Sequence, residues 1–118
     1  MSAPVKVGVV GVGHMGKEHA RIYAESAKAE LVGVYDTDPH TAKKIADKHR
    51  TRVFATLAEM VEATEAVSVV TPTLNHLASA EPFLRKGRHV LVEKPIAMDT
   101  KEARELVTLA EKNGAKLA

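Results

Sequence analysis

Three closely spaced glycines near the start of the chain are the strongest indication of chemistry. Residues 11–16 read Gly-Val-Gly-His-Met-Gly and follow directly after Val5–Val10, a run rich in β-branched residues. In a turn from a strand into a helix, Gly11 would permit the sharp bend and Gly13 would leave room for a diphosphate beside the backbone. Gly16 would let the helix pack closely against the strand. The spacing is therefore typical of a dinucleotide-binding turn.

The same turn predicts an anion site made of backbone groups. The N–H groups of Gly13, His14 and Met15 would point outward at the positive end of the helix dipole. The turn lacks the Gly-Lys-Ser/Thr ending of a nucleoside-triphosphate loop. We therefore expect the diphosphate of a dinucleotide at this place.

An acidic residue stands where a dinucleotide-binding fold holds the ribose of adenosine. Asp36 ends the second strand-like run, residues 31–36, and lies 20 residues after Gly16. Its carboxylate can accept hydrogen bonds from both ribose hydroxyls and would repel a 2′-phosphate. No arginine follows it, since Thr37 and Asp38 come next. The sequence therefore favours NAD over NADP; the alternative is a tight glycine turn in which Asp36 only caps a loop.

The elements that must position these residues alternate along the chain. Strands are expected at residues 5–10, 31–36, 52–55, 66–71 and 89–93, and helices at 14–25, 38–49, 56–63, 74–86 and 99–113, with 115–118 beginning another strand. Short connections between alternating strands and helices predict parallel strands joined by right-handed crossovers. We therefore predict an α/β fold: a Rossmann-type doubly wound parallel sheet in three layers, with residues 1–118 forming a single domain.

Four of the expected helices have a candidate inner face. In the second helix it consists of residues 42, 45, 46 and 49, and in the fourth of residues 77, 80 and 84. Met15, His19 and Ile22 share one face of the first helix at spacings of four and three residues. In the last helix we expect the face that includes Leu106 and Val107 to point toward the core.

Two further loops should meet the glycine turn at the carboxyl edge of the sheet, where ligands of such sheets bind. Residues 71–76 read Thr-Pro-Thr-Leu-Asn-His, and residues 93–95 read Glu-Lys-Pro. The alternatives are ordinary: Asn75 and His76 would cap the following helix, and Glu93 with Lys94 would be a solvated ion pair.

Composition excludes several classes of protein. The 118 residues are 45% apolar and 27% charged with a net charge of +2, and no basic run concentrates this charge, which argues against nucleic-acid or membrane-surface binding. The chain has no cysteine, hence no disulfide, thiolate metal site or cysteine nucleophile. The six histidines show no converging ligand pattern, so no metal site is expected. Without a membrane span or secretion signal, a cytoplasmic location is expected.

Several motifs together resemble a known family. Residues 11–16 with His19 three residues later, the acid-ended run Val-Tyr-Asp, the 71–76 loop and above all the stretch His-Val-Leu-Val-Glu-Lys-Pro-Ile-Ala, residues 89–97, look like the nucleotide-binding domain of the Gfo/Idh/MocA oxidoreductases. That family includes glucose–fructose oxidoreductase, inositol dehydrogenase and sugar-nucleotide dehydrogenases. The resemblance covers essentially the whole chain, and its wording is closest to members that oxidise C3 of UDP-N-acetyl-hexosamines or their uronic acids.

The resemblance implies roles for particular residues. It implies that a sugar or polyol hydroxyl is oxidised, or the ketone reduced, with hydride passing to or from the nicotinamide. Lys94 would lie beside the nicotinamide and the substrate hydroxyl as the candidate catalytic residue, and Glu93 would support the same pocket. The residues that would line the dinucleotide are Thr71, Pro72, Asn75 and His76.

The chain also departs from the family. Members usually carry a second domain that supplies most of the substrate pocket and the general acid–base histidine. We therefore expect an isolated, truncated cofactor-binding domain that binds NAD without efficient catalysis and self-associates through an exposed domain-facing surface. Two alternatives stay open at this point: a non-catalytic NAD-sensing module, and a domain that binds S-adenosylmethionine.

Overall fold

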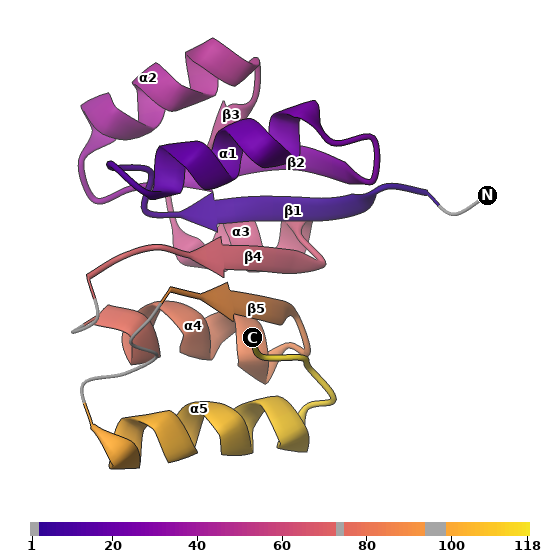
Figure 1. The fold of residues 1–118 in the computed structure, drawn as a ribbon, viewed down its shortest axis with the longest axis vertical. Coiled ribbons are helices and arrows are strands. Elements are labelled where there is room, and N and C mark those ends of the chain that lie inside the picture. Colours follow the sequence, from indigo (N-terminus) through magenta and orange to yellow (C-terminus); the bar gives the residue numbers. More distant parts are fainter. Residues whose placement is uncertain (1–2, 73–74, 94–98) are drawn as a thin grey trace.

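The computed structural model describes residues 3–72, 75–93 and 99–118, and within them the strands form one parallel sheet (Figure 1). The strand order is β3-β2-β1-β4-β5, so the winding reverses between β1 and β4. The bounds are β1 Val5–Val10, β2 Ala29–Tyr35, β3 Arg52–Val53, β4 Ala66–Val69 and β5 His89–Val92. This is the doubly wound Rossmann arrangement that the alternating pattern predicts.

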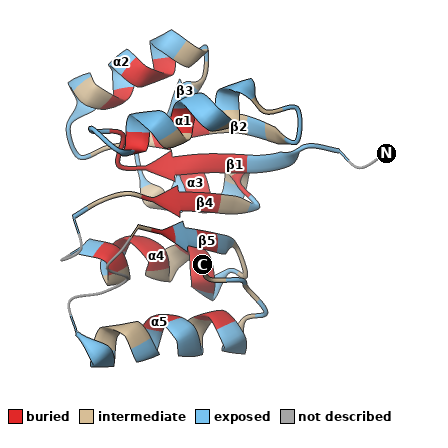
Figure 2. Ribbon diagram, in the orientation of Figure 1, coloured by how far each residue is buried: buried red, intermediate tan, exposed pale blue. Residues whose placement is uncertain are grey.

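The helices form the two outer layers. Their bounds are α1 Gly16–Glu25, α2 Pro39–His49, α3 Leu57–Ala63, α4 His76–Arg85 and α5 Thr100–Lys112. One core cluster joins the sheet to α1 and α2, and a second joins it to α3, α4 and α5, so the helices divide between the two faces (Figure 1). The central strands β1, from Val7 onward, and β4 are buried on both faces, as Figure 2 shows. The predicted three layers are confirmed.

Three helices begin where the sequence places a capping side chain. Asp38 accepts a hydrogen bond from the backbone N–H of His40, Thr56 accepts one from Glu59, and Asp99 accepts one from Glu102. Such caps satisfy N–H groups that have no partner within the helix. The caps therefore fix where α2, α3 and α5 begin after the strands that precede them.

The strands are shorter than expected at the carboxyl edge. β4 ends at Val69 and β5 at Val92, whereas the expected strands extend to residues 71 and 93. The N–H of Val70 still donates to Val10 at 2.8 Å, after which the chain turns away toward α4. The expected strand at the end of the chain is present as one parallel bridge between Val90 and Leu117.

The expected inner faces of α2 and α4 are confirmed, since Ala42, Ile45, Ala46, Ala80 and Leu84 are buried. Those of α1 and α5 need correction. Met15 and Ile22 are 51% and 54% exposed, and α1 instead buries Gly16 and Ala20. The face of α1 toward the sheet consists of Gly16, His19, Ala20 and Tyr23, of which Gly16 must be small because the helix begins directly against Gly11. In α5, Val107 is likewise exposed, at 43%.

Candidate functional site

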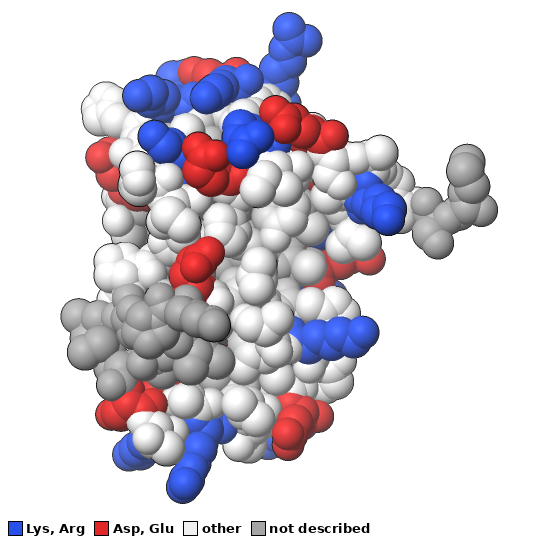
Figure 3. Space-filling view, in the orientation of Figure 1, with Lys and Arg blue, Asp and Glu red and all other residues white. Residues whose placement is uncertain are grey.

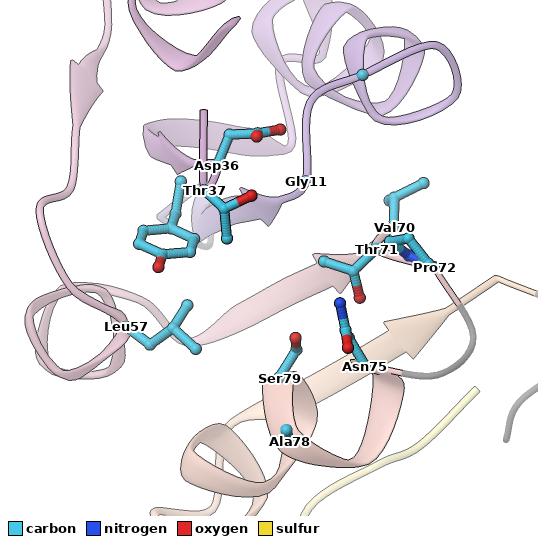
Figure 4. Close-up of a pocket in the computed structure, with 12 residues that line it drawn as sticks. Gly11, Asp36, Thr37, Leu57, Val70, Thr71, Pro72, Asn75, Ala78 and Ser79 are labelled. Carbon is cyan, nitrogen blue, oxygen red and sulfur yellow. The ribbon is translucent and has the colours of Figure 1, made fainter. Parts of the chain in front are cut away.

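A cavity of about 350 Å³ opens at the carboxyl edge of the sheet, beside the glycine turn (Figure 4). It lies where the winding reverses, so residues from both halves of the fold meet there. Its lining residues are Gly11, Gly13, Tyr35, Asp36, Thr37, Leu57, Val70, Thr71, Pro72, Asn75, Ala78 and Ser79. The structure thus brings the glycine turn, the acid after β2 and the loop after β4 to one place.

A side chain at any of the three glycines would either clash with the backbone of the turn or fill part of the cavity. Gly11 has a φ of 88°, and a Cβ there would lie 2.9 Å from the carbonyl oxygen of Val70. A Cβ on Gly16 would overlap the carbonyl oxygen of Gly11, so the first helical turn packs directly on the bend. Gly13 differs, since a Cβ there would meet no protein atom within 4 Å. Because Gly13 lines the cavity, a side chain there would occupy space that is open to a ligand.

The carboxylate of Asp36 holds the glycine turn against the end of β2. Its Oδ2 accepts a hydrogen bond from the N–H of Val12 at 3.0 Å, and its Oδ1 accepts one from Asp38 at 2.9 Å. Both suggested roles are therefore compatible: Asp36 caps the loop and also lines the cavity. A carboxylate has about four acceptor sites, so two backbone donors leave it able to accept ribose hydroxyls.

The pKa of the next carboxyl along the chain, that of Asp38, is lowered. The hydroxyl of Thr41 and the backbone N–H of His40 donate to Asp38 and hold the pKa of this carboxyl below its ordinary value of 3.8. Asp38 is exposed and caps α2. Together with Asp36 it makes this end of the cavity acidic, which disfavours an additional phosphate.

The loop after β4 presents polar atoms to the opposite wall of the cavity. Figure 4 shows the side chains of Thr71, Asn75 and Ser79 directed into the cavity, the last two from the start of α4. The Thr71 hydroxyl is buried, and it is the one buried side-chain polar atom without a partner in the described part of the chain. Unpaired buried polar atoms are costly, so a ligand that bonds to this hydroxyl is favoured.

His76 takes a different position from the one expected. Its side chain is 1% exposed, and its Nε2 lies 2.8 Å from the carbonyl oxygen of Thr71. His76 therefore holds the loop after β4 through the backbone of Thr71, and it does not line the cavity.

His14, Met15, Gly16 and Glu93 lie outside the cavity lining. His14 and Met15 are exposed on the glycine turn, and Glu93 follows β5 and contacts His19. Lys94, the candidate catalytic residue, lies outside the described residues.

Several lining residues were not anticipated from the sequence. They are Tyr35, Thr37, Leu57, Val70, Ala78 and Ser79. Two of them could have been predicted from their neighbours in the sequence. Leu57 follows the capping Thr56, and Ser79 lies one helical turn after Asn75. The others depend on how the strand ends approach one another.

The cavity suits a dinucleotide on three independent observations. Gly13 leaves a cradle that a Cβ would fill, Thr71 offers an unpartnered hydroxyl, and Asp36 offers free acceptor sites. A metal centre lacks comparable support, since no group of three or more His, Asp or Glu gathers within residues 3–72, 75–93 and 99–118. None of the helices in those ranges is long and apolar enough to cross a membrane.

Comparison with known proteins identifies the family of the chain. Residues 5–118 match the family model described as an oxidoreductase family with an NAD-binding Rossmann fold. A UDP-N-acetylglucosamine 3-dehydrogenase of Acidithiobacillus ferrooxidans is 40% identical over 114 residues, which are 97% of this chain and 36% of that protein. An inositol 2-dehydrogenase of Rhizobium meliloti is 35% identical over 114 residues, 96% of this chain and 34% of that protein.

A solved structure gives the same picture of the fold. GenD2 from gentamicin A biosynthesis, in complex with NAD, superimposes with a TM-score of 0.94 and 35% identity, over 100% of this chain and 34% of that one. The chain thus spans about a third of the length of the relatives it matches. Family model, sequence likeness and fold coincide: the chain belongs to the Gfo/Idh/MocA oxidoreductase family, of which it is an NAD-binding Rossmann domain.

Proposed function

We propose that this chain is the cofactor-binding part of an NAD-dependent oxidoreductase that acts on a CH–OH group of a sugar, sugar nucleotide or polyol. The observation that carries the proposal is the open cradle at Gly13, which faces a cavity with the Asp36 carboxylate on its wall. The two relatives named above act on a sugar nucleotide and on inositol, which supports the substrate class.

Roles for individual residues follow from their positions. The N–H groups of Gly13, His14 and Met15 would bind the diphosphate at the start of α1, and Asp36 would accept the ribose hydroxyls of adenosine. Bound NAD supplies a hydride acceptor.

On the other side of the cavity, Thr71, Pro72 and Asn75 would contact the dinucleotide. Lys94 is proposed, on the family resemblance, to orient the substrate hydroxyl. Slow turnover by the 118-residue chain alone and a cytoplasmic location stay predictions.

A thermal-shift experiment on the 118-residue chain tests the proposal. A ligand at a hundred times its Kd adds about 2.7 kcal/mol to the free energy of unfolding. We expect NAD to raise the melting temperature and S-adenosylmethionine to leave it unchanged. A rise with S-adenosylmethionine and none with NAD would refute the proposal.

Replacing Asp36 tests the choice between NAD and NADP. In Asp36→Ser the charge that repels a 2′-phosphate and bonds the ribose is lost, and a hydrogen bond to a charged group contributes about 1.5–3 kcal/mol. We expect NAD to bind roughly 10- to 100-fold more weakly and the preference for NAD over NADP to fall by at least about tenfold, measured by titration calorimetry. Asp47→Ser, which removes the same charge from the far end of α2, should change neither affinity. Unchanged discrimination in Asp36→Ser would remove this residue from its role.

Self-association is proposed through the part of the sheet that no described helix covers. Leu91 on β5 is 40% exposed and lies in register with Ser68, on the face that α1 covers further along the sheet. In Figure 3 charged side chains gather mainly over the helices at the two ends of this view, and few lie over the middle. Exposed apolar surface of this kind promotes association.

A further inference from the structure

Four polar side chains form a continuous hydrogen-bonded chain between α1, β4 and the end of β5. The Tyr23 hydroxyl lies 2.6 Å from Ser68 Oγ, which lies 3.1 Å from His19 Nδ1. His19 Nε2 lies 2.7 Å from Glu93 Oε1. These contacts join residues 45 to 74 positions apart in sequence, so only the folded sheet brings them together.

The chain is mostly shielded from water. Ser68 is 0% exposed, in a strand otherwise composed of Ala and Val, and the His19 side chain is 16% exposed. Glu93 at the outer end is 39% exposed. A buried hydroxyl costs free energy unless it is paired, and Ser68 has two partners. Ser68 therefore provides a buried hydrogen-bond partner for the Nδ1 of His19.

The donors and acceptors have one consistent order when the imidazole is neutral. An ionised carboxylate only accepts, so the Nε2–H of His19 donates to Glu93. The Nδ1 of His19 then accepts from the Ser68 hydroxyl, whose oxygen accepts from Tyr23. The Glu93 carboxylate thus sets the tautomer of His19, while Ser68 and Tyr23 hold the ring at Nδ1 so that His19 fixes the carboxylate in turn.

Glu93 occupies the half of the fold that Asp36 does not. A doubly wound sheet has two mononucleotide-binding halves, and Asp36 follows β2 in the first. Glu93 follows β5 in the second, and its N–H donates to Val69 on β4. Each half therefore has a carboxylate held at the carboxyl edge: Asp36 by backbone N–H groups, Glu93 by an imidazole.

We propose that His19 is a positioning residue for the nicotinamide half of the dinucleotide site, acting through Glu93 with Ser68 and Tyr23 as its support. The inference rests on the proposed NAD binding. The inference divides the proposed NAD site into two parts. The glycine turn and Asp36 bind the adenosine and diphosphate, and the His19–Glu93 pair binds the nicotinamide riboside.

Two ligands separate this role from a merely structural one. ADP carries the adenosine and diphosphate of NAD but lacks the nicotinamide riboside. In His19→Phe, which keeps a ring and removes both nitrogens, we expect the Kd for NAD to rise about tenfold, the loss expected for a charged hydrogen bond, while that for ADP stays within about twofold. Arg21→Ala removes exposed ion pairs to Glu18 and Glu25 on the same helix and should change neither Kd.

A second variant keeps the test decisive if His19→Phe does not fold. Glu93→Gln preserves the shape of an accessible side chain, and we expect the same selective loss of NAD affinity. In the double variant the two effects should not add, because they remove the same interaction. Equal losses for NAD and ADP, or no loss for either, would overturn the inference. Failure of the unsubstituted chain to bind either ligand would instead refute the proposed function.

Discussion

Gly13→Ala is expected to abolish most of the affinity for NAD while leaving the fold intact. The added methyl group meets no protein atom within 4 Å, but it stands in the cradle that a diphosphate would occupy. Displacing a diphosphate from its backbone N–H donors costs about 2–3 kcal/mol, or roughly 30- to 150-fold in Kd. Titration calorimetry measures the loss.

The stability of the same variant is its internal control. Gly13 has no positive φ, so alanine fits the backbone and reduces the freedom of the unfolded chain. The melting temperature without ligand should therefore stay unchanged or rise slightly. An unchanged Kd for NAD would show that the diphosphate does not bind at this turn.

Gly16→Ala is expected to have the opposite profile, with a large loss of stability. Alanine normally stabilises a helix by about 1 kcal/mol relative to glycine. Here its Cβ would overlap the carbonyl oxygen of Gly11, and backbone on both sides must move apart. We expect a loss of about 3 kcal/mol or more, at the upper end of overpacking costs, measured by urea denaturation.

The matched control lies on the same helix. Ala24 is exposed on α1, so Ala24→Gly should follow ordinary helix propensity and cost about 1 kcal/mol. The two substitutions exchange the same two residue types in opposite directions, and both are expected to destabilise. A Gly16→Ala variant as stable as the unsubstituted chain would mean that the helix does not press on the bend as the structure shows.

Local signals in the sequence were sufficient for the architecture. The glycine turn, the capping residues Asp38, Thr56 and Asp99, and the alternation of apolar runs each depend on neighbours within a few residues. Such short-range chemistry specifies where elements begin. It also located the carboxyl edge, and with it most of the polar residues around the cavity.

Contacts across the sheet were not predictable in the same way. The partnership of His19 with Glu93 depends on the register between β4 and β5 and on how α1 lies over them. The family resemblance implied that His76 lines the dinucleotide, yet its side chain is buried. Met15 and Ile22 looked buried because they share a helical face with His19, but the close approach of Gly16 to the bend turns the face of Gly16, Ala20 and Tyr23 toward the sheet instead.

The central place of β1 affects how the protein acquires its structure during synthesis. β1 is made first, but its partner on one side begins at Ala66, which pairs with Val7, 59 residues later. A nascent chain emerging from the ribosome therefore holds an apolar strand whose second edge stays unsatisfied until β4 has been translated. Pairing between strands that are far apart in sequence slows folding and leaves unpaired strand edges open to association with other chains. Among the described strands, β1 is thus the one that waits longest for its second partner and has the longest need for protection by chaperones.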